Sequence, residues 1–268
     1  MSIQLGMIGG GMMGEALISR LVIQEVYASE QILVSDPQAE RRKFLSDRYG
    51  VQTTSENLEV AQAEVLLLAI KPQVFDRVAA ELAGNGATSL SLILSILAGT
   101  SLEKLEQAFP SKAVIRAMPN TPATVGAGVT AISPGLFVQP HHLQQATRIF
   151  GAVGEVVEVA ESYMDAITGL SGSGPGYVAL MIEALADGGV AVGLPRAIAT
   201  KLAIQTVKGS AQLLQDTGMH PAQLKDQVTS PGGTTIAGIA HLERAGVRSA
   251  LIEAVHAAYV RSQELGKS

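Results

Sequence analysis

The stretch MIGGGMMGEA, Met7 to Ala16, determines the architecture that we expect for this 268-residue chain. It directly follows an apolar run that is typical of a buried strand, and it opens a segment with helical spacing of apolar residues. Gly9, Gly11 and Gly14 match the pattern G-x-G-x-x-G. In this setting the first glycine makes a tight turn, the second lets a pyrophosphate approach the backbone, and the third lets the helix pack closely on the strand. The stretch therefore predicts a dinucleotide held on backbone amides at the start of a helix.

Short apolar runs alternate with helical patterns through the first half of the chain. This alternation is typical of a parallel, doubly wound α/β sheet with right-handed crossovers. Residues 40–50 predict a charged amphipathic helix that ends at Gly50, and residues 128–133 and 154–160 could add strands near the edge of the sheet. The main strands are predicted at Ile3–Gly9, Gln31–Asp36, Glu64–Ile70, Leu90–Leu97 and Lys112–Met118.

The second half of the chain has a different pattern. From Ser162 onward no strand-like run follows, and long segments rich in Ala, Gly and Leu predict helices. We therefore expect a dinucleotide-binding domain over residues 1–160 and a helical domain over residues 161–268. The predicted helices are Pro175–Gly193, Pro195–Gln215, His220–Val228 and Arg248–Gly266.

One predicted helix of the second half carries little side-chain bulk. Gly188, Gly189, Ala191 and Gly193 would let another backbone approach closely. A helical half of this kind could bury its apolar surface against a second copy of itself in a symmetric dimer. The alternative is a self-contained helical domain.

Composition excludes several classes of protein. The net charge of −5 argues against a nucleic-acid groove or a surface for anionic membranes, because phosphate binding needs clustered Lys and Arg. The sequence has no cysteine, which excludes disulfides, thiolate catalysis and zinc–thiolate sites. The histidines show no metal-ligand spacing, and no apolar run reaches the length of a membrane span. We expect a cytoplasmic protein with no metal and no nucleic-acid or membrane partner.

The residues at the end of the second predicted strand are expected to bind the ribose of the dinucleotide. Asp36 lies about 20 positions beyond the glycine loop, where an acidic residue binds the 2′-hydroxyl of NAD. Ser35 is a hydroxyl residue, and Arg41 and Arg42 could meet the 2′-phosphate of NADP. The two arginines could equally lie on a solvated helix face. The choice of coenzyme therefore stays open at this point.

Three loops follow predicted strands at the edge where ligands bind in an open parallel sheet. They are Ala69–Gln73, Leu97–Ser101 and Arg116–Ala123. In the third loop Met118 and Thr121 both precede proline, which favours extended backbone and a stiff loop. Each loop by itself could be an ordinary turn, but three loops at one edge favour a binding site.

A second glycine turn, VTSPGGTTIAGI, spans Val228 to Ile239 in the helical half. It belongs to no strand–helix–strand unit, so a dinucleotide is the wrong ligand for it. Pro231 stiffens the turn, the glycines let a ligand come close, and the amides of Thr234 and Thr235 begin the next helix. The turn therefore predicts a site for a small anion.

Six motifs resemble one family, in the same order along essentially the whole chain. They are GMIGGGMMGEAL, LAIKPQ, IRAMPNTPA, GLSGSGPGY, DGGVAVGLPR and HPAQLKDQVTSPGGTT. The sequence is similar to pyrroline-5-carboxylate reductase, and the last motif is the most specific. The resemblance implies NAD(P)H-dependent reduction of L-1-pyrroline-5-carboxylate to L-proline, the last step of proline synthesis. It implies a Rossmann-type doubly wound parallel sheet with a C-terminal all-helical dimerisation domain. It also implies a homodimer or higher homo-oligomer with interlocked helical domains and an active site at the subunit interface.

The same resemblance implies the site residues. The coenzyme that it implies is NADPH. NADH is the alternative, because Asp36 stands where NADPH-using members tend to have a small or hydroxyl residue. Thr235 is the predicted catalytic residue, whose hydroxyl bonds the ring nitrogen of the substrate and can return a proton to it. The substrate-binding residues are Ser230, Gly233, Thr234 and Thr235. The coenzyme-binding residues are Gly9, Gly10, Gly11, Met12, Met13, Ser35, Asp36, Asn57, Ala69, Ile70, Lys71, Ala98, Gly99, Met118, Pro119 and Asn120.

Two other functions remain open on the sequence. The β-hydroxyacid dehydrogenases share the layout of the chain, but they need a helix-borne lysine that faces the nicotinamide. Lys201 and Lys208 are the available lysines on the long helix of the second half, and neither lies in a matching motif. A non-catalytic nucleotide sensor would keep the first glycine loop without needing the TSPGGTT and MPNTP motifs together.

Overall fold

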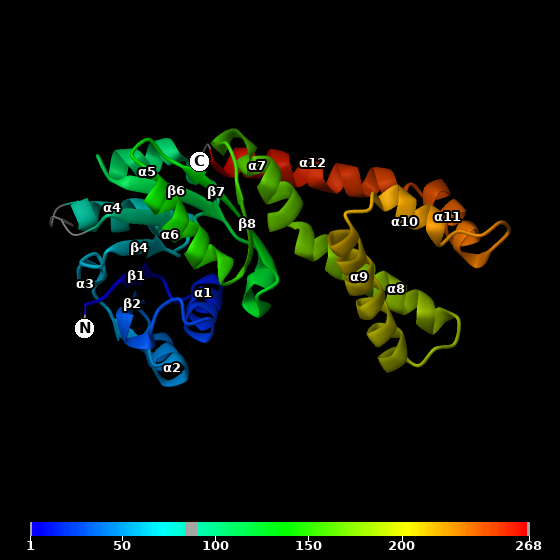
Figure 1. Ribbon diagram of the computed structural model, residues 1–268, viewed down its shortest axis with the longest axis horizontal. Helices are drawn as coiled ribbons and strands as arrows, with labels where there is room; N and C mark the ends of the chain where they lie inside the picture. The colour runs from blue at the N-terminus through cyan, green and yellow to red at the C-terminus, as the bar shows by residue number, and fades with distance from the viewer. Residues whose placement is uncertain (1, 84–89, 267–268) are drawn as a thin grey trace. The chain divides into compact units, whose positions relative to one another are not determined.

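The computed structural model describes residues 2–83 and 90–266. The first residue and the last two, where the predicted domains begin and end, lie outside the described residues, as do residues 84–89. The chain divides into two compact units, one formed by Met1–Gly172 with Ala257–Ser268 and the other by Ser173–His256 (Figure 1). Residues 161–172 and 257–266 thus lie with the sheet. The limits 1–160 and 161–268, which divide the chain by sequence pattern, stay a prediction.

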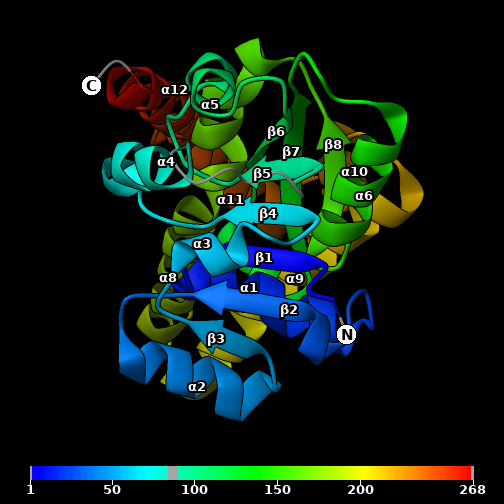
Figure 2. The same cartoon turned by 90° about the vertical axis from the view of Figure 1, so that its left-hand side faces the viewer.

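The first unit is built on one sheet. Its described residues form an eight-stranded sheet in the order β3-β2-β1-β4-β5-β6-β7-β8 (Figure 2). The strand order reverses beside β1, as in doubly wound folds. The strands from β3 to β6 pair in parallel, which confirms the predicted fold class. The strands are β1 (Leu5–Ile8), β2 (Ile32–Ser35), β3 (Gln52–Thr54), β4 (Val65–Leu68), β5 (Leu92–Ser95), β6 (Ala113–Met118), β7 (Gly128–Pro134) and β8 (Gly154–Glu158).

The edge of the sheet departs from the parallel pattern. Strands β7 and β8 extend the sheet where residues 128–133 and 154–160 are expected to do so, but β7 pairs antiparallel with β6. The physical reason is the short connection between β6 and β7, most of which is the 3₁₀ turn Thr121–Val125. A parallel pair needs a crossover of a dozen or more residues, whereas antiparallel neighbours accept a short connection.

Helices cover both faces of the sheet (Figure 2). The four residues of β4, Val-Leu-Leu-Leu, are fully buried, and they alternate between two apolar cores on opposite faces. This arrangement explains why the central strands are continuous apolar runs. One face is covered by α1 (Met12–Ile23), α2 (Ala39–Tyr49) and α6 (Pro140–Gly151), and the other by α3 (Asn57–Val60), α4 (Phe75–Ala83) and α5 (Leu102–Ala108).

The described residues after β8 form helices joined by turns, with no strand among them, as the sequence predicts. In the second unit α8 and α9 lie side by side (Figure 1), and a β-carbon on Gly189 would lie 3.0 Å from that of Ala199. Small residues therefore let the two helices approach closely. None of the helices in the described part of the chain has the length and hydropathy of a membrane span. The helices after β8 are a 3₁₀ turn (Glu161–Tyr163), α7 (Met164–Ile167), a π-helical turn (Thr168–Gly172), α8 (Gly174–Ala191), α9 (Arg196–Thr217), α10 (Pro221–Gln227), α11 (Thr234–Arg244) and α12 (Val247–Gly266).

Candidate active site

The carboxyl ends of four parallel strands meet at one edge of the sheet. Ile8 of β1 pairs with Leu68 of β4, Leu68 pairs with Ser95 of β5, and Ser95 pairs with Arg116 of β6. The chain leaves each of these strands into a predicted coenzyme segment, and this edge is where open parallel sheets bind ligands. These segments are Gly9–Met13, Ala69–Lys71, Ala98–Gly99 and Met118–Asn120.

The first glycine loop has the geometry of a pyrophosphate cradle. Gly9 has a φ of +100°, and a β-carbon there would lie 2.5 Å from the carbonyl oxygen of Ala69. A β-carbon on Gly14 would lie 2.5 Å from the carbonyl oxygen of Gly9, so this glycine allows helix α1 to pack on the turn. A β-carbon on Gly11 would meet nothing within 4 Å. Folding therefore requires the outer two glycines, whereas the space above Gly11 is open for a ligand.

The N-terminus of α1 points its free amides at the same place. Gly11 is the N-cap residue of α1, and no side chain caps the helix there. The first amides of a helix have no partner within the helix, and the helix dipole adds partial positive charge. Because an anion satisfies both, the residues present fit the pyrophosphate of a dinucleotide.

Two predicted residues meet beside the end of β2. Ser35 is buried, and its hydroxyl donates a 2.6 Å hydrogen bond to Oδ1 of Asn57. The amide of Asn57 donates in turn to a carboxylate oxygen of Glu81 at 2.9 Å. The Ser35 hydroxyl is therefore committed as a donor inside the protein.

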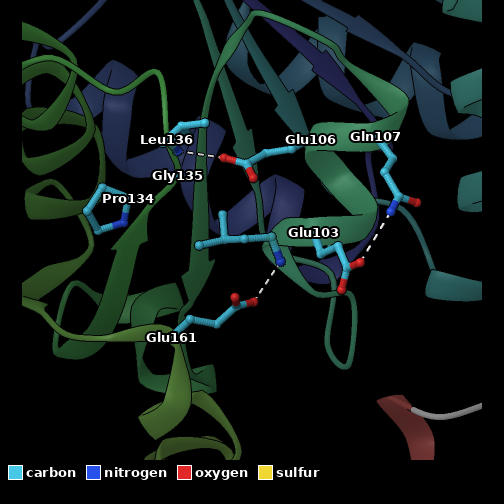
Figure 3. Close-up of a pocket in the computed structure, with 8 residues that line it drawn as sticks. Glu103, Glu106, Gln107, Pro134, Gly135, Leu136 and Glu161 are labelled. Carbon is cyan, nitrogen blue, oxygen red and sulfur yellow. Dashed lines mark hydrogen bonds between the residues drawn. The ribbon is translucent and has the colours of Figure 1, made fainter.

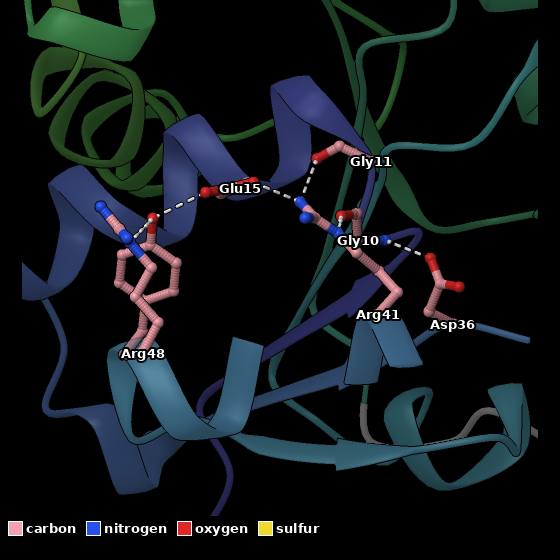
Figure 4. Close-up of polar contacts among 7 residues, drawn as sticks. Gly10, Gly11, Glu15, Asp36, Arg41 and Arg48 are labelled. Carbon is pink, nitrogen blue, oxygen red and sulfur yellow. Dashed lines mark hydrogen bonds and ion pairs between the residues drawn. The ribbon is translucent and has the colours of Figure 1, made fainter. Parts of the chain in front are cut away.

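A polar cluster joins β2 and α2 to the glycine loop (Figure 4). Asp36 accepts a hydrogen bond from the backbone N–H of Gly10 at 3.0 Å. The guanidinium of Arg41 donates to the carbonyl oxygens of Gly10 and Gly11 and forms an ion pair with Glu15 of α1. The cluster thus holds the loop through a backbone N–H as well as through two backbone carbonyl oxygens.

Glu15 is held ionised within this cluster. Its second carboxylate oxygen accepts a hydrogen bond from the hydroxyl of Tyr49 at 2.8 Å. Burial would raise the pKa of Glu15, but hydrogen bonds from Arg41 and Tyr49 and the nearby charges of Arg41 and Arg48 together lower it below its ordinary value. The negative charge opposite Arg41 therefore persists into mildly acidic solution.

The segment Met118–Asn120 is attached to the π-helical turn. The buried side chain of Asn120 accepts a hydrogen bond from the N–H of Val129 at 3.0 Å and donates one to the carbonyl of Ser171 at 3.1 Å. A β-carbon on Gly172 would lie 2.9 Å from the end of the Met118 side chain. The motif GLSGSGPGY thus contacts the predicted nicotinamide segment. The sequence did not predict this contact, although Gly172, which has no side chain, was a possible sign of a close approach.

The Ala98–Gly99 segment has a neighbour from the end of the chain. Gly99 has a φ of +73°, and a β-carbon there would lie 3.4 Å from the backbone nitrogen of Gly266 in α12. Ser262 of α12 also donates to Asp165 of α7 at 2.6 Å. The last turns of α12 therefore pack beside a predicted coenzyme segment, which no local sequence pattern indicated.

An acidic hollow of about 620 Å³ lies beside α5, outside the predicted site (Figure 3). Glu106 accepts a hydrogen bond from the N–H of Leu136 at 2.6 Å. Glu161 accepts from the N–H of Leu102 at 2.6 Å and from the buried guanidinium of Arg116 at 2.9 Å. Both carboxylates are thus used in holding strands and α5 together, and none of the predicted site residues lines the hollow.

The predicted substrate residues form a group of their own in the second unit. Gly232 has a φ of +67°, and the N–H of Gly233 donates to the carbonyl of Ser230 at 3.0 Å. Gly233 is the N-cap residue of α11, which begins at Thr234, and no side chain caps the helix. The turn therefore offers helix amides beside the half-buried Thr235, as an anion site requires.

The comparisons with known proteins agree along the whole chain. Residues 161–265 match the family model for pyrroline-5-carboxylate reductase dimerisation, and residues 4–99 match the model for coenzyme F420-dependent NADP oxidoreductase. The chain is 62% identical to pyrroline-5-carboxylate reductase of Synechocystis over 100% of both chains. It is 40% identical to the enzyme of that name from Escherichia coli over 99% of both chains.

Solved structures of similar proteins have the same fold. A pyrroline-5-carboxylate reductase from Coxiella burnetii has a TM-score of 0.92 and 35% identity, covering 99% of both chains. The pyrroline carboxylate reductase of Plasmodium falciparum, solved with NADP bound, has a TM-score of 0.89 and 32% identity, covering 98% of both chains. These relatives cover both the sheet and the helices that follow it.

Proposed function

The chain belongs to the pyrroline-5-carboxylate reductase family, and from this premise we propose that it reduces L-1-pyrroline-5-carboxylate to L-proline as an oxidoreductase of proline biosynthesis. The observation that carries the proposal is the identity of 62% over both full chains, together with a glycine cradle that fits NAD(P)H. The cytoplasmic location, which rests on the sequence alone, stays a prediction.

The residues of the first unit hold and orient the coenzyme. The amides at the start of α1 bind the pyrophosphate above Gly11, and the residues after β2 bind the adenosine ribose. The segments Ala98–Gly99 and Met118–Asn120 form the nicotinamide site. When bound, the reduced nicotinamide supplies a hydride to the carbon of the substrate C=N bond. A protonated cyclic imine is already electrophilic, so orientation by these segments can lower the barrier by about 7–11 kcal/mol at most.

The residues of the second glycine turn hold the substrate. The amides at the start of α11, with Ser230, Gly233 and Thr234, bind the substrate carboxylate. The hydroxyl of Thr235 accepts a hydrogen bond from the N–H of the protonated imine. After hydride transfer the neutral amine nitrogen has a lone pair, so the same hydroxyl can donate to it and return a proton that solvent replaces. Neither a nucleophile nor a metal is needed for this reaction.

The protein is a homo-oligomer, as the dimerisation model over residues 161–265 indicates. We propose a homodimer or a higher oligomer in which the helical domains interlock, as the family resemblance implies. The second unit supports this proposal because large apolar side chains are exposed on it, with Val192 82% and Leu180 67% exposed. Exposed apolar surface of this extent is typical of an interface.

A coupled assay of the purified full chain tests the function. Absorbance of the reduced nicotinamide is followed with pyrroline-5-carboxylate present, with NADPH and NADH in parallel, and proline is identified by mass spectrometry. We expect oxidation of the coenzyme with equimolar formation of proline. A preparation that binds nucleotide but leaves the imine unreduced would overturn the proposal. Oxidation of β-hydroxyacids by the same preparation would instead indicate the rival class of dehydrogenases.

A further inference from the structure

The ribose side of the glycine loop presents a fixed carboxylate. Oδ2 of Asp36 accepts from the N–H of Gly10 at 3.0 Å, and Oδ1 accepts from the N–H of Gln38 at 2.9 Å. These two backbone donors hold the side chain against the loop at the end of β2. Each carboxylate oxygen keeps a further lone pair, so the group can still accept a hydrogen bond from a ribose hydroxyl.

The groups that could bind a 2′-phosphate make hydrogen bonds within the protein. Nε and Nη2 of Arg41 donate to the carbonyl oxygens of Gly10 and Gly11, and Nη2 pairs with Glu15. Arg42 donates to the carbonyl oxygens of Asp36 and Pro37 at 2.7 and 3.1 Å. The Ser35 hydroxyl donates to Asn57 inside the protein. A phosphate at this position would meet an anchored carboxylate, with its neighbouring cations already paired or turned to the backbone.

Building on the proposed function, we propose that the ribose subsite formed by Asp36, Arg41 and Glu15 selects the coenzyme without a 2′-phosphate, NADH, over NADPH. Asp36 is the specificity-determining residue, because a carboxylate accepts a hydrogen bond from a 2′-hydroxyl and repels a phosphate. Glu15 is a positioning residue. It neutralises Arg41 and holds its guanidinium on the glycine loop, away from a 2′-phosphate.

Binding without the imine tests this inference separately from catalysis. Isothermal titration of the full chain compares NADH with NADPH, and ADP-ribose with its 2′-phosphorylated form. We expect the ligands without the phosphate to bind at least about tenfold more tightly, which corresponds to about 1.4 kcal/mol. The difference should shrink as salt is added, because its origin is partly exposed charge.

Variants of Asp36 separate charge from shape. Asp36→Asn should remove most of the discrimination by tightening NADPH binding about tenfold, whereas Asp36→Glu, which retains the charge, should keep the preference for NADH. Asp47→Asn is the matched control. It makes the same charge change on the exposed part of α2, where Asp47 pairs only with Lys43 in the contacts described, and it should leave both affinities unchanged.

A variant of Glu15 tests the positioning role. Glu15→Gln removes the charge that neutralises Arg41, so NADPH affinity should rise by about three- to tenfold while NADH affinity stays within about twofold. A merely structural role would weaken both coenzymes together. Thermal unfolding of each variant checks that the fold is intact, and the Glu15 result stands even if Asp36→Asn fails to fold.

The outcomes are distinct. Wild-type protein that binds NADPH as tightly as NADH, or a folded Asp36→Asn protein with unchanged preference, would overturn the inference. If neither nucleotide binds, both the inference and the proposed function are wrong. If the preference for NADH holds but the imine is not reduced, the proposed function fails and the assignment of the ribose subsite stands.

Discussion

The side chain of Asn120 donates a hydrogen bond to the carbonyl of Ser171 at 3.1 Å, although 51 positions separate the two residues in the chain. The other end of the same side chain accepts from the N–H of Val129 at 3.0 Å. One buried amide therefore ties the predicted nicotinamide segment both to β7 and to the π-helical turn. Because the position of that segment depends on both bonds, we expect Asn120 to couple stability to coenzyme orientation.

Replacing Asn120 with aspartate should separate these contacts. The variant keeps the acceptor for Val129 but places an oxygen against the carbonyl of Ser171, so the free energy of unfolding should fall by about 1–3 kcal/mol. A displaced nicotinamide segment should also lower kcat/KM by about 10- to 100-fold. Urea titration and steady-state kinetics measure the two effects. Thr124→Ala, which removes an exposed hydrogen bond of the same loop, is the control. Equal behaviour of the two variants would show that the Asn120 bridge has no special role.

The glycines of the first loop should respond to alanine in opposite ways. Gly11→Ala should leave the free energy of unfolding within about 1 kcal/mol of the parent, because its β-carbon meets nothing within 4 Å and its φ of −65° suits any residue. The added methyl should weaken coenzyme binding by about tenfold or more, since it occupies the space where the pyrophosphate approaches.

Gly9→Ala should instead affect folding. Its φ of +100° and the 2.5 Å approach to the Ala69 carbonyl should lower the free energy of unfolding by at least about 1–2 kcal/mol. Calorimetric binding and urea titration of both variants check the pair. Unchanged coenzyme affinity in a folded Gly11→Ala protein would contradict the location assigned to the pyrophosphate.

The sequence predicts the central part of the fold because its signals there are local. The run Val65–Leu68 is apolar throughout, and a strand covered on both faces has that composition. Strand β3, Gln52–Thr54, is short and polar, so no apolar run revealed it, and it forms through backbone pairing with β2. The return of α12 to Gly99 was equally hidden, because tertiary packing and not helical periodicity decides it.

The same distinction applies to the candidate site. The glycine pattern predicts the cradle because its outer two glycines meet local steric requirements, such as the positive φ of Gly9, and its middle glycine leaves space for a ligand. The ion pair between Arg41 and Glu15 depends on how α2 lies across α1, and the two residues are 26 positions apart. No periodicity within either helix specifies that contact. The sequence therefore could not decide whether Arg41 binds a phosphate or lies on a solvated helix face.

His142 should make stability depend on pH near neutrality. It is buried near the start of α6, where its Nδ1 accepts from the N–H of Gln139 at 3.0 Å. Burial, and to a smaller degree the neighbouring His141, lowers the pKa of His142 below its ordinary value of 6.5. At pH values between the lowered pKa and 6.5, the unfolded chain binds more protons at His142 than the folded protein does. The contribution of His142 to stability is therefore full above pH 6.5 and is lost as the pH falls through the folded pKa.

The test compares urea midpoints of wild type and His142→Asn at about pH 8 and about pH 5. The variant should lose about 1 kcal/mol at the higher pH, through the weakened cap, and should show a smaller further loss in acid than the wild type. His141→Asn, on the exposed neighbour, should keep most of the wild-type slope. An identical acid loss in wild type and His142→Asn would assign the pH dependence to other groups.

The hydroxyl of Thr235 should matter for the chemical step more than for folding. It is half-buried in the first turn of α11 beside an uncapped N-terminus, where the substrate carboxylate is proposed to bind. Thr235→Ala should lower kcat/KM for pyrroline-5-carboxylate by about 100-fold, since the hydrogen bond between this hydroxyl and the ring nitrogen is lost, while coenzyme affinity stays unchanged. Thr235→Ser should recover part of the rate because it restores the hydroxyl. The control is Thr217→Ala, which removes a hydroxyl that bonds the Leu213 carbonyl at the end of α9. If kcat/KM of Thr235→Ala equals that of the control, the ring nitrogen takes its proton from another group, and the TSPGGTT turn serves only to bind the carboxylate.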